Sequence, residues 1–147
     1  SEKAQIFIHH SVLCKYSIFI QTQTESGWGS FWRPSIVSLP KESPKIVRTY
    51  VNWLYSAQLP PFYCPQDLSA ANGDQLRKVF RELARCYVFV ERITDARFQN
   101  DIIDAMASLI RRLPDSAPFF SVGSAVVWTI HNGTPDDSPA QRFLTRL

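Results

Sequence analysis

The sequence predicts an α+β fold in which helices dominate and a small sheet lies at the N-terminal end. Three observations lead to this prediction. Apolar residues recur at helical spacing along residues 74–90, and they do so again along residues 94–113. Near the start of the chain, Ala4, Ile6 and Ile8 alternate with Gln5 and Phe7, which is the two-residue period of a strand.

Short elements are expected between that strand and the first marked helix. Ser11 can cap a helix at residues 12–16, and a second helical stretch is expected at residues 18–24. Residues 26–30 hold two glycines and two serines, so a loop is expected there. Residues 36–39 predict a brief strand that Pro40 stops.

The next helix has a well-marked start. Ser43 is the expected N-cap, and Pro44 takes the first helical position, where its missing N–H costs nothing. One face of this helix carries the apolar residues Ile46, Val47, Tyr50, Val51 and Leu54. Residues 60–73 are then expected to form a long irregular connection.

Two long amphipathic helices are predicted after it, one from Asp74 and one from Thr94. The apolar face of the first consists of Leu76, Val79, Phe80, Leu83, Tyr87 and Val90. The apolar face of the second consists of Phe98, Ile102, Ala105, Met106, Leu109 and Leu113. Because the connection at residues 92–94 is short, an antiparallel helix pair is the simplest way to bury both faces.

The C-terminal part predicts two further helices. One covers residues 124–130, with Gly133 ending it. The other begins at Ser138, which is followed by proline and then by glutamine in a capping-box pattern. No stop signal follows, so this helix is expected to be still running at Leu147, as in a fragment of a longer protein.

Composition narrows the class of protein. A chain of 147 residues with 45 % hydrophobic residues can form one domain with its own core. The net charge of +3 is mild and the cations are scattered, which gives little support to nucleic-acid binding. Cys14, Cys64 and Cys86 include no CxxC spacing and indicate free thiols in a reducing compartment, either cytoplasmic or nuclear. No apolar run approaches the length of a membrane span.

Four segments, taken together, carry a family resemblance. They read "FIHHSVLCKYSIFI", "IVSLPKESPKIVRTYVNWLYSAQL", "LARCYVFVERITDARFQN" and "TPDDSPAQRFL", in this order along the chain. In sequence and spacing they resemble the BTB/POZ domain, in the divergent form found in filamentous fungi.

The resemblance implies a fold and a class of function. The fold would be a three-stranded sheet, lacking its first strand here, flanked by helical hairpins. The domain would span residues 1–113, and residues 114–147 would be a helical extension packed on it. The family binds proteins: many members form homodimers through their first helices, and some dock a cullin ubiquitin-ligase scaffold. Trp53 and Tyr55 would be core residues.

One position weakens the cullin alternative. Cullin-binding members of the family often carry an acidic residue in the loop before the strand that ends Leu-Pro. Here Arg33 follows Phe31 and Trp32 in that loop. Because a reversed charge at such a contact can cost several kcal/mol, we expect weak cullin binding or none.

The adjacent histidines raise the question of a metal or redox site. Zinc needs three or four converging ligands, whereas His9, His10 and Cys14 offer at most two near neighbours. On a strand, His9 and His10 would point to opposite faces. The resemblance implies that His9 is half-buried, with its ring N–H bonded to backbone. We therefore expect no metal, and a metal- or redox-dependent site at these three residues is kept only as a distant alternative.

No pattern in the sequence indicates catalysis or a cofactor. Glycine-rich phosphate loops, HExxH and GxSxG are all missing from the sequence. Cys86 lies on a predicted long helix beside a core tyrosine, where a small packing residue is expected. We therefore expect neither enzymatic activity nor a small-molecule substrate.

The expected function is a non-catalytic protein interaction, most simply homodimerisation or adaptor assembly, without a membrane or nucleic acid. The candidates for a self-association surface on the first helices are His10, Lys15, Tyr16, Phe19 and Ile20, all expected to be exposed. A second group, Trp28, Phe31, Trp32 and Arg33, lies in a loop that either folds back on the core or meets a partner. Along one helix, Arg77, Lys78, Arg81 and Arg85 form a basic stripe, for which a solvated face is the first expectation and an acidic or nucleic-acid partner the second.

Overall fold

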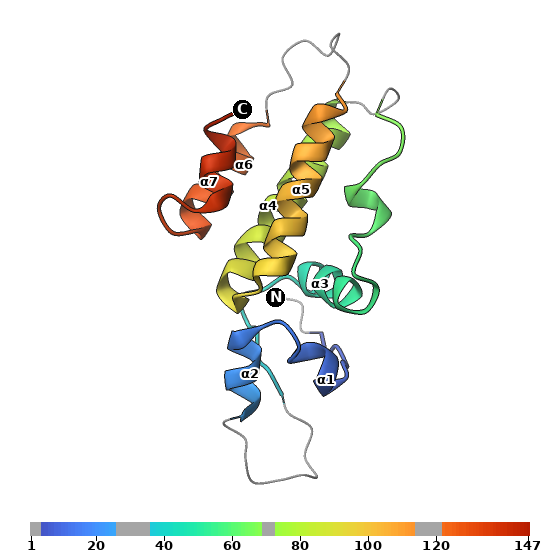
Figure 1. Cartoon of the computed structure of the whole chain (residues 1–147), viewed down its shortest axis with the longest axis vertical. Coiled ribbons are helices and arrows are strands. Elements are labelled where there is room, and N and C mark those ends of the chain that lie inside the picture. The colour runs from blue at the N-terminus through green and yellow to red at the C-terminus, as the bar shows by residue number, and fades with distance from the viewer. Residues whose placement is uncertain (1–3, 26–35, 69–72, 114–121) are drawn as a thin grey trace.

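A long helical hairpin organises the molecule (Figure 1). The structure is a computed structural model that describes residues 4–25, 36–68, 73–113 and 122–147. The elements are α1 (His10–Leu13), α2 (Ile18–Glu25), α3 (Pro44–Ser56), the 3₁₀ turn η1 (Pro61–Tyr63), α4 (Gly73–Ile93), α5 (Ala96–Arg111), α6 (Ser124–Gly133) and α7 (Pro139–Leu144). The antiparallel pairing of α4 and α5 confirms the hairpin predicted from the two apolar faces.

The other helices are arranged around α4. Helix α6 packs along it, and α7 packs on α6. Helix α3 crosses near the C-terminal end of α4, and α1 and α2 lie beyond that end (Figure 1). Central α4 buries eleven of its residues, which makes it the main contributor to the core.

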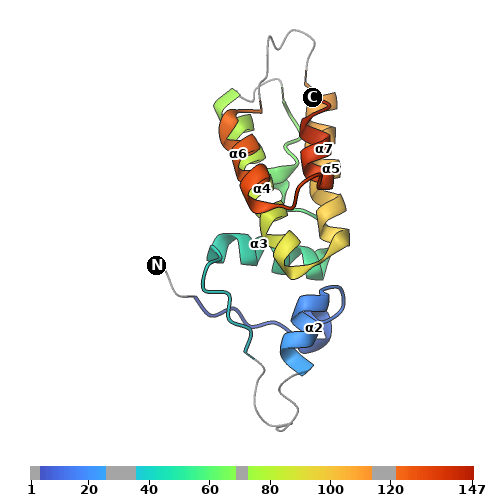
Figure 2. The same cartoon turned by 90° about the vertical axis from the view of Figure 1, so that its left-hand side faces the viewer.

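The predicted sheet is wrong, because the described part of the chain contains no strand. Residues 4–9 and 36–39 have no regular secondary structure, and Figure 2 shows them as extended chain. Phe7 is 90 % exposed and Ile36 is 86 % exposed, so neither segment buries an apolar face at these side chains. Val37 and Leu39 are half-buried against the core, but two short strands by themselves are at best marginally stable. The alternation at residues 4–8 therefore indicated extended backbone and not strand pairing.

Most of the helix predictions are confirmed, but several boundaries differ, including the start of α5, which is Ala96 and not Thr94. Helix α1 begins at His10 and ends at Leu13, earlier than the predicted residues 12–16. Helix α7 ends at Leu144, with Thr145 as its C-cap, so the expectation that it runs on at Leu147 is wrong. Ser138 caps α7 as predicted, because its hydroxyl accepts the Gln141 N–H.

Aromatic rings fill the core where α3 meets the hairpin. The Tyr50 ring stacks on Trp53, with centroids 6.0 Å apart, and Phe98 lies 5.2 Å from Tyr50. Trp53 is buried as predicted, and its indole N–H donates to the Asp101 carboxylate at 2.6 Å. The prediction that Tyr55 is a core residue is wrong, since it is 51 % exposed.

The turn between α4 and α5 is closed by one buried carboxylate. Asp95 is the N-cap of α5 and has no exposed surface. Its Oδ1 accepts the backbone N–H groups of Arg97 and Phe98, at 3.1 and 3.2 Å. Its Oδ2 accepts the hydroxyl proton of Tyr50 at 2.8 Å, which fastens α3 to the hairpin.

A serine hydroxyl attaches α2 to the same turn. Fully buried Ser17 donates to the carbonyl of Ile93, the last residue of α4, and accepts the N–H of Ile20 in the first turn of α2. Helix ends leave such backbone groups without intrahelical partners. This single hydroxyl therefore bonds one backbone group at the end of each helix, and the Ile93 carbonyl also accepts the Thr94 hydroxyl proton.

Helix α6 approaches α4 very closely at one point. A Cβ atom added to Gly133 would lie 2.4 Å from both γ-carbons of Val88. Only glycine leaves enough room for this contact, so Gly133 sets the distance between the C-terminal end of α6 and α4.

Cys86 is fully buried on α4, which confirms its predicted packing role. Burial raises the pKa of its thiol from 9.0 to about 12, and the Glu82 carboxylate adds to this, while Tyr63 and Lys45 act in the opposite direction. The folded pKa exceeds the unfolded one, so the stabilising contribution is complete below the unfolded pKa and is lost as the pH rises toward the folded pKa.

Stability is therefore expected to fall at alkaline pH. Between a pH of about 9 and about 10, ionisation of this thiol in the unfolded chain should lower the free energy of unfolding by about 1 kcal/mol. Urea titrations at both pH values measure the change. Cys86→Ala should make it smaller by about this amount without removing it, because burial also raises the pKa values of Tyr50, Tyr63 and Tyr87. An equal pH dependence in that variant would contradict the assignment.

Candidate functional site

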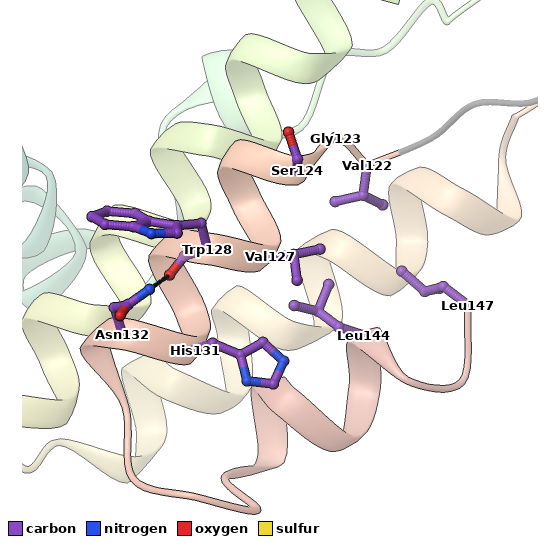
Figure 3. A pocket seen from close by; sticks show the side chains of 9 residues that line it. All are labelled: Val122, Gly123, Ser124, Val127, Trp128, His131, Asn132, Leu144 and Leu147. Carbon is purple, nitrogen blue, oxygen red and sulfur yellow. Dashed lines mark hydrogen bonds between the residues drawn. The ribbon is translucent and has the colours of Figure 1, made fainter.

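A groove runs between α6 and α7, with a volume of about 760 Å³. We call it the α6–α7 groove (Figure 3). Its lining consists of Val122, Gly123, Ser124, Val127, Trp128, His131, Asn132, Leu144 and Leu147. Figure 3 shows Val127 of α6 and Leu144 of α7 pointing toward one another, while Trp128 extends from the other flank of α6.

The sequence of α6 explains why this surface is apolar. Val126 and Ile130, four residues apart, face α4 and are buried. Val127 and Trp128 lie on other sides of the same helix, and they are 40 % and 69 % exposed. A helix with apolar residues on several sides is normally covered on several sides. In α6 only the side toward α4 is fully covered.

The lining chemistry suits apolar contact. Among the residues that the structure describes, the lining contains no Lys, Arg, Asp or Glu side chain, and its polar side chains are Ser124, His131 and Asn132. The Asn132 amide donates to the Trp128 carbonyl at 2.9 Å within the helix. Within the described residues, no hydrogen bond joins the Ser124 hydroxyl to the His131 ring, the pair that could supply a nucleophile and a base.

The five candidates on the first helices are placed differently from one another. His10 and Lys15 are exposed as expected, while Tyr16 and Phe19 are half-buried and pack against the core. The expectation that Ile20 is exposed is wrong, because it is 2 % exposed. Its neighbour Ile18, 65 % exposed, is the outward-facing isoleucine that sequence reasoning did not select.

Tyr16 is held between cations and an aromatic ring. The Arg97 guanidinium lies 4.4 Å and the Lys15 ammonium 5.1 Å from its ring centroid, and the Trp53 ring lies 6.0 Å away. A hydrogen bond from Lys15 is the main cause that lowers the pKa of the Tyr16 phenol, and the Arg97 charge adds to it against the opposing effect of burial. Tyr16 therefore contributes to the attachment of the first helices to α3 and α5.

The candidate loop residues Trp28, Phe31, Trp32 and Arg33 lie outside the described residues. Their predicted roles, and the expectation about cullin binding that depends on Arg33, stay predictions.

Each of the two adjacent histidines contacts another side chain of the same chain. The Nδ1 atom of His9 lies 2.7 Å from the Tyr55 hydroxyl, and its backbone N–H donates to the same oxygen. His9 is exposed and its ring contacts a side chain, so the expectation of a half-buried ring bonded to backbone is wrong. The Nε2 atom of His10 lies 3.5 Å from the Cys14 sulfur. Within the described ranges, no three His, Cys, Asp or Glu side chains are grouped so that they could hold a metal ion.

A second, smaller pocket of about 490 Å³ lies beside η1 and α5. Two carboxylates, Asp101 and Asp104, line it together with Cys64 and Ser108. Asp101 already accepts the Trp53 indole N–H, so part of its hydrogen-bonding capacity is committed to the core. This pocket has fewer apolar groups than the α6–α7 groove, and the hydrogen-bonding capacity of its polar groups is partly taken up within the molecule. The α6–α7 groove is therefore the stronger candidate.

No protein-family model matches the chain, and no curated protein and no solved structure matches it. Among the described helices, none is both long enough and apolar enough to cross a membrane.

Proposed function

We propose that this chain is a non-catalytic protein-interaction module whose α6–α7 groove binds an apolar helical segment of a partner protein. The observation that supports this most strongly is Trp128, a large aromatic side chain that is 69 % exposed beside an uncharged groove. Tryptophan is among the residues most enriched at the energetic centres of protein interfaces. The resemblance of four segments to BTB/POZ proteins, which bind proteins, supports the same class of function.

The size of the surface favours a segment over a whole second subunit. Val127, Trp128 and Leu147 together expose on the order of 300 Å² of apolar side chain, which is typical of a functional patch on a monomer. A stable dimer interface needs about 800 Å² from each partner. The groove alone is therefore better matched to a helix that inserts a few side chains.

The shape and charge of the groove indicate which kind of segment it would bind. Two helices form its sides, and an amphipathic helix laid into such a groove anchors residues spaced by three or four positions. Because the lining has no charged side chain that could pair with a buried ion, the inserted side chains must be apolar.

A photo-crosslinking amino acid at position 127 tests this proposal in extracts of cells that make the protein. We expect it to crosslink an apolar segment of one protein, and the synthetic peptide of that segment should bind the wild type. Trp128→Glu should weaken binding of the peptide at least about tenfold, because it places a charge where the apolar anchor packs.

Two controls make the result specific. Phe7→Glu changes another exposed aromatic residue and should leave peptide binding unchanged. Both variants alter exposed side chains, so circular dichroism should show the same helix content as in the wild type. Equal binding of the peptide by the Trp128 variant, or crosslinking to nothing but a second copy, would contradict the proposal.

Self-association is a second candidate, and exposed apolar side chains at the N-terminal end favour it. Phe7, Ile18 and Ile36 are 90 %, 65 % and 86 % exposed. If these side chains hold two copies together, light scattering after size exclusion should show a dimer that Ile18→Glu converts to a monomer. Ile18 is preferable to Phe19 as the substituted residue, since Phe19 packs on the core. A wild-type monomer at every concentration would exclude this candidate.

A further inference from the structure

One face of α4 carries a concentrated positive charge. Lys78, Arg81, Glu82 and Arg85 follow the spacing i, i+3, i+4 and i+7, so their side chains are neighbours on the helix surface. From α3, Lys45 reaches the same place, because its ammonium lies 3.0 Å from Glu82 Oε2. We call these five residues the α4 basic face.

The single carboxylate of this face, that of Glu82, already forms two ion pairs. Its Oε1 lies 3.1 Å from the Arg85 guanidinium and its Oε2 contacts Lys45, and the Glu82 side chain is only 9 % exposed. The paired cations remain open to solvent, with the Lys45 and Arg85 side chains 57 % and 55 % exposed. Four cations against one carboxylate leave a surplus of three positive charges, as large as the net charge of +3 of the whole chain.

Two of the cations have no carboxylate partner. Lys78 and Arg81 are exposed, and neither forms an ion pair with any acidic side chain in the ranges that the structure describes. Arg81 also lies four residues from Arg77 and four from Arg85, and like charges at this spacing destabilise a helix. A helix selected for stability alone would favour an acidic residue at position 81.

An apolar ring borders the charged face. Phe62 of η1 is 44 % exposed, and the Lys45 ammonium lies 5.5 Å from its ring centroid. A ligand on this face would therefore meet several cations and one aromatic surface together.

We propose that the α4 basic face binds an acidic segment of a partner protein, with an apolar side chain of that segment packed on Phe62. The carboxylates of the segment would pair with Lys78 and Arg81, the two cations of this face that form no ion pair within the described part of the chain. The carboxylate of Glu82 at the centre of the face favours discrete acidic side chains over a continuous phosphate backbone, which would pass close to it. This site is separate from the α6–α7 groove, and neither proposal depends on the other.

Fluorescence anisotropy with the whole chain tests the proposal. The probe is a labelled peptide of Glu-Glu-Leu repeats, with a Gln-Gln-Leu peptide and a single-stranded oligothymidylate as comparisons. We expect binding of the acidic peptide alone, weakening about tenfold between ionic strengths of about 0.01 M and 0.15 M, because exposed charges are screened by salt.

A matched pair of double variants identifies the surface. Lys78→Glu with Arg81→Glu should abolish binding. The glutamate at position 81 can pair with Arg77 and Arg85, whereas the glutamate at position 78 lies four residues from Asp74 and from Glu82, so circular dichroism of this variant checks that the helix stays folded. Lys41→Glu with Arg146→Glu makes the same change in net charge at other exposed positions and should leave binding within about twofold of the wild type. Equal losses in both double variants would show that net charge and not this face is responsible, and would overturn the proposal.

Two further outcomes would also overturn it. Tighter binding of the oligothymidylate than of the acidic peptide would identify a nucleic-acid surface. Absence of binding by every anionic probe at low salt would show that the α4 basic face is only a solvated surface.

Discussion

Asp95→Ala is expected to lower the free energy of unfolding by about 3 kcal/mol. The substitution removes the acceptor of two N–H groups at the start of α5, and loss of an N-cap typically costs about 1 kcal/mol. It also leaves the Tyr50 hydroxyl buried without its partner, which costs about 1–3 kcal/mol more. Urea unfolding followed by circular dichroism measures the difference.

Two further variants separate the contribution of the N-cap from that of the bond to Tyr50. Asp95→Asn keeps an oxygen that can cap α5 and an amide that can bond the Tyr50 hydroxyl, so we expect it to cost only about 1 kcal/mol. Tyr50→Phe removes the other partner, and the double variant with Asp95→Ala should be less destabilised than the sum of the single variants. If the alanine and asparagine variants were equally stable, the carboxylate would not have the structural role assigned to it.

Gly133→Ala is expected to destabilise the fold by about 2 kcal/mol. The new methyl group would overlap Val88, and overpacking of this kind typically costs about 1–3 kcal/mol. Both γ-carbons of a stiff β-branched side chain lie too close, which places the cost at the upper end. The higher helix propensity of alanine offsets about 0.5–1 kcal/mol of it.

Two comparisons show whether the contact with Val88 causes the loss of stability in Gly133→Ala. Gly73→Ala, at the start of α4, meets only an arginine nitrogen at 3.9 Å and should be neutral or slightly stabilising. Val88→Ala frees the space that the new methyl group needs. In the double variant, Gly133→Ala should therefore cost much less than it does alone. An unchanged cost would mean that backbone geometry and not this contact requires glycine.

The helices could be predicted because their signals are long and repeated. Both members of the α4–α5 hairpin keep apolar residues in phase over several turns, which no strand pattern reproduces. The strand at residues 4–8 rested on one short alternation, which cannot distinguish a paired strand from an extended segment. Pairing depends on a distant partner, and the local sequence does not contain that information.

The candidate surfaces were harder to predict for a related reason. Helix α6 is apolar around much of its circumference, so its pattern does not show which side faces α4, and Trp128 could as well have been buried. On α2, the choice between Ile18 and Ile20 depends on the rotation of a short helix. That rotation is fixed by the bond from Ser17 to Ile93, residues far apart in the sequence.

That bond also affects how the molecule opens. Because the Ser17 hydroxyl serves the first turn of α2 and the last carbonyl of α4 together, detachment of α2 exposes backbone groups of both helices at once. We expect the Ile20 amide hydrogen, which the Ser17 hydroxyl accepts, to exchange with solvent at a lower free energy than the amide hydrogens in the middle of α4. Through this hydroxyl, the end of the central helix is tied to the N-terminal helices, although it is continuous with the core.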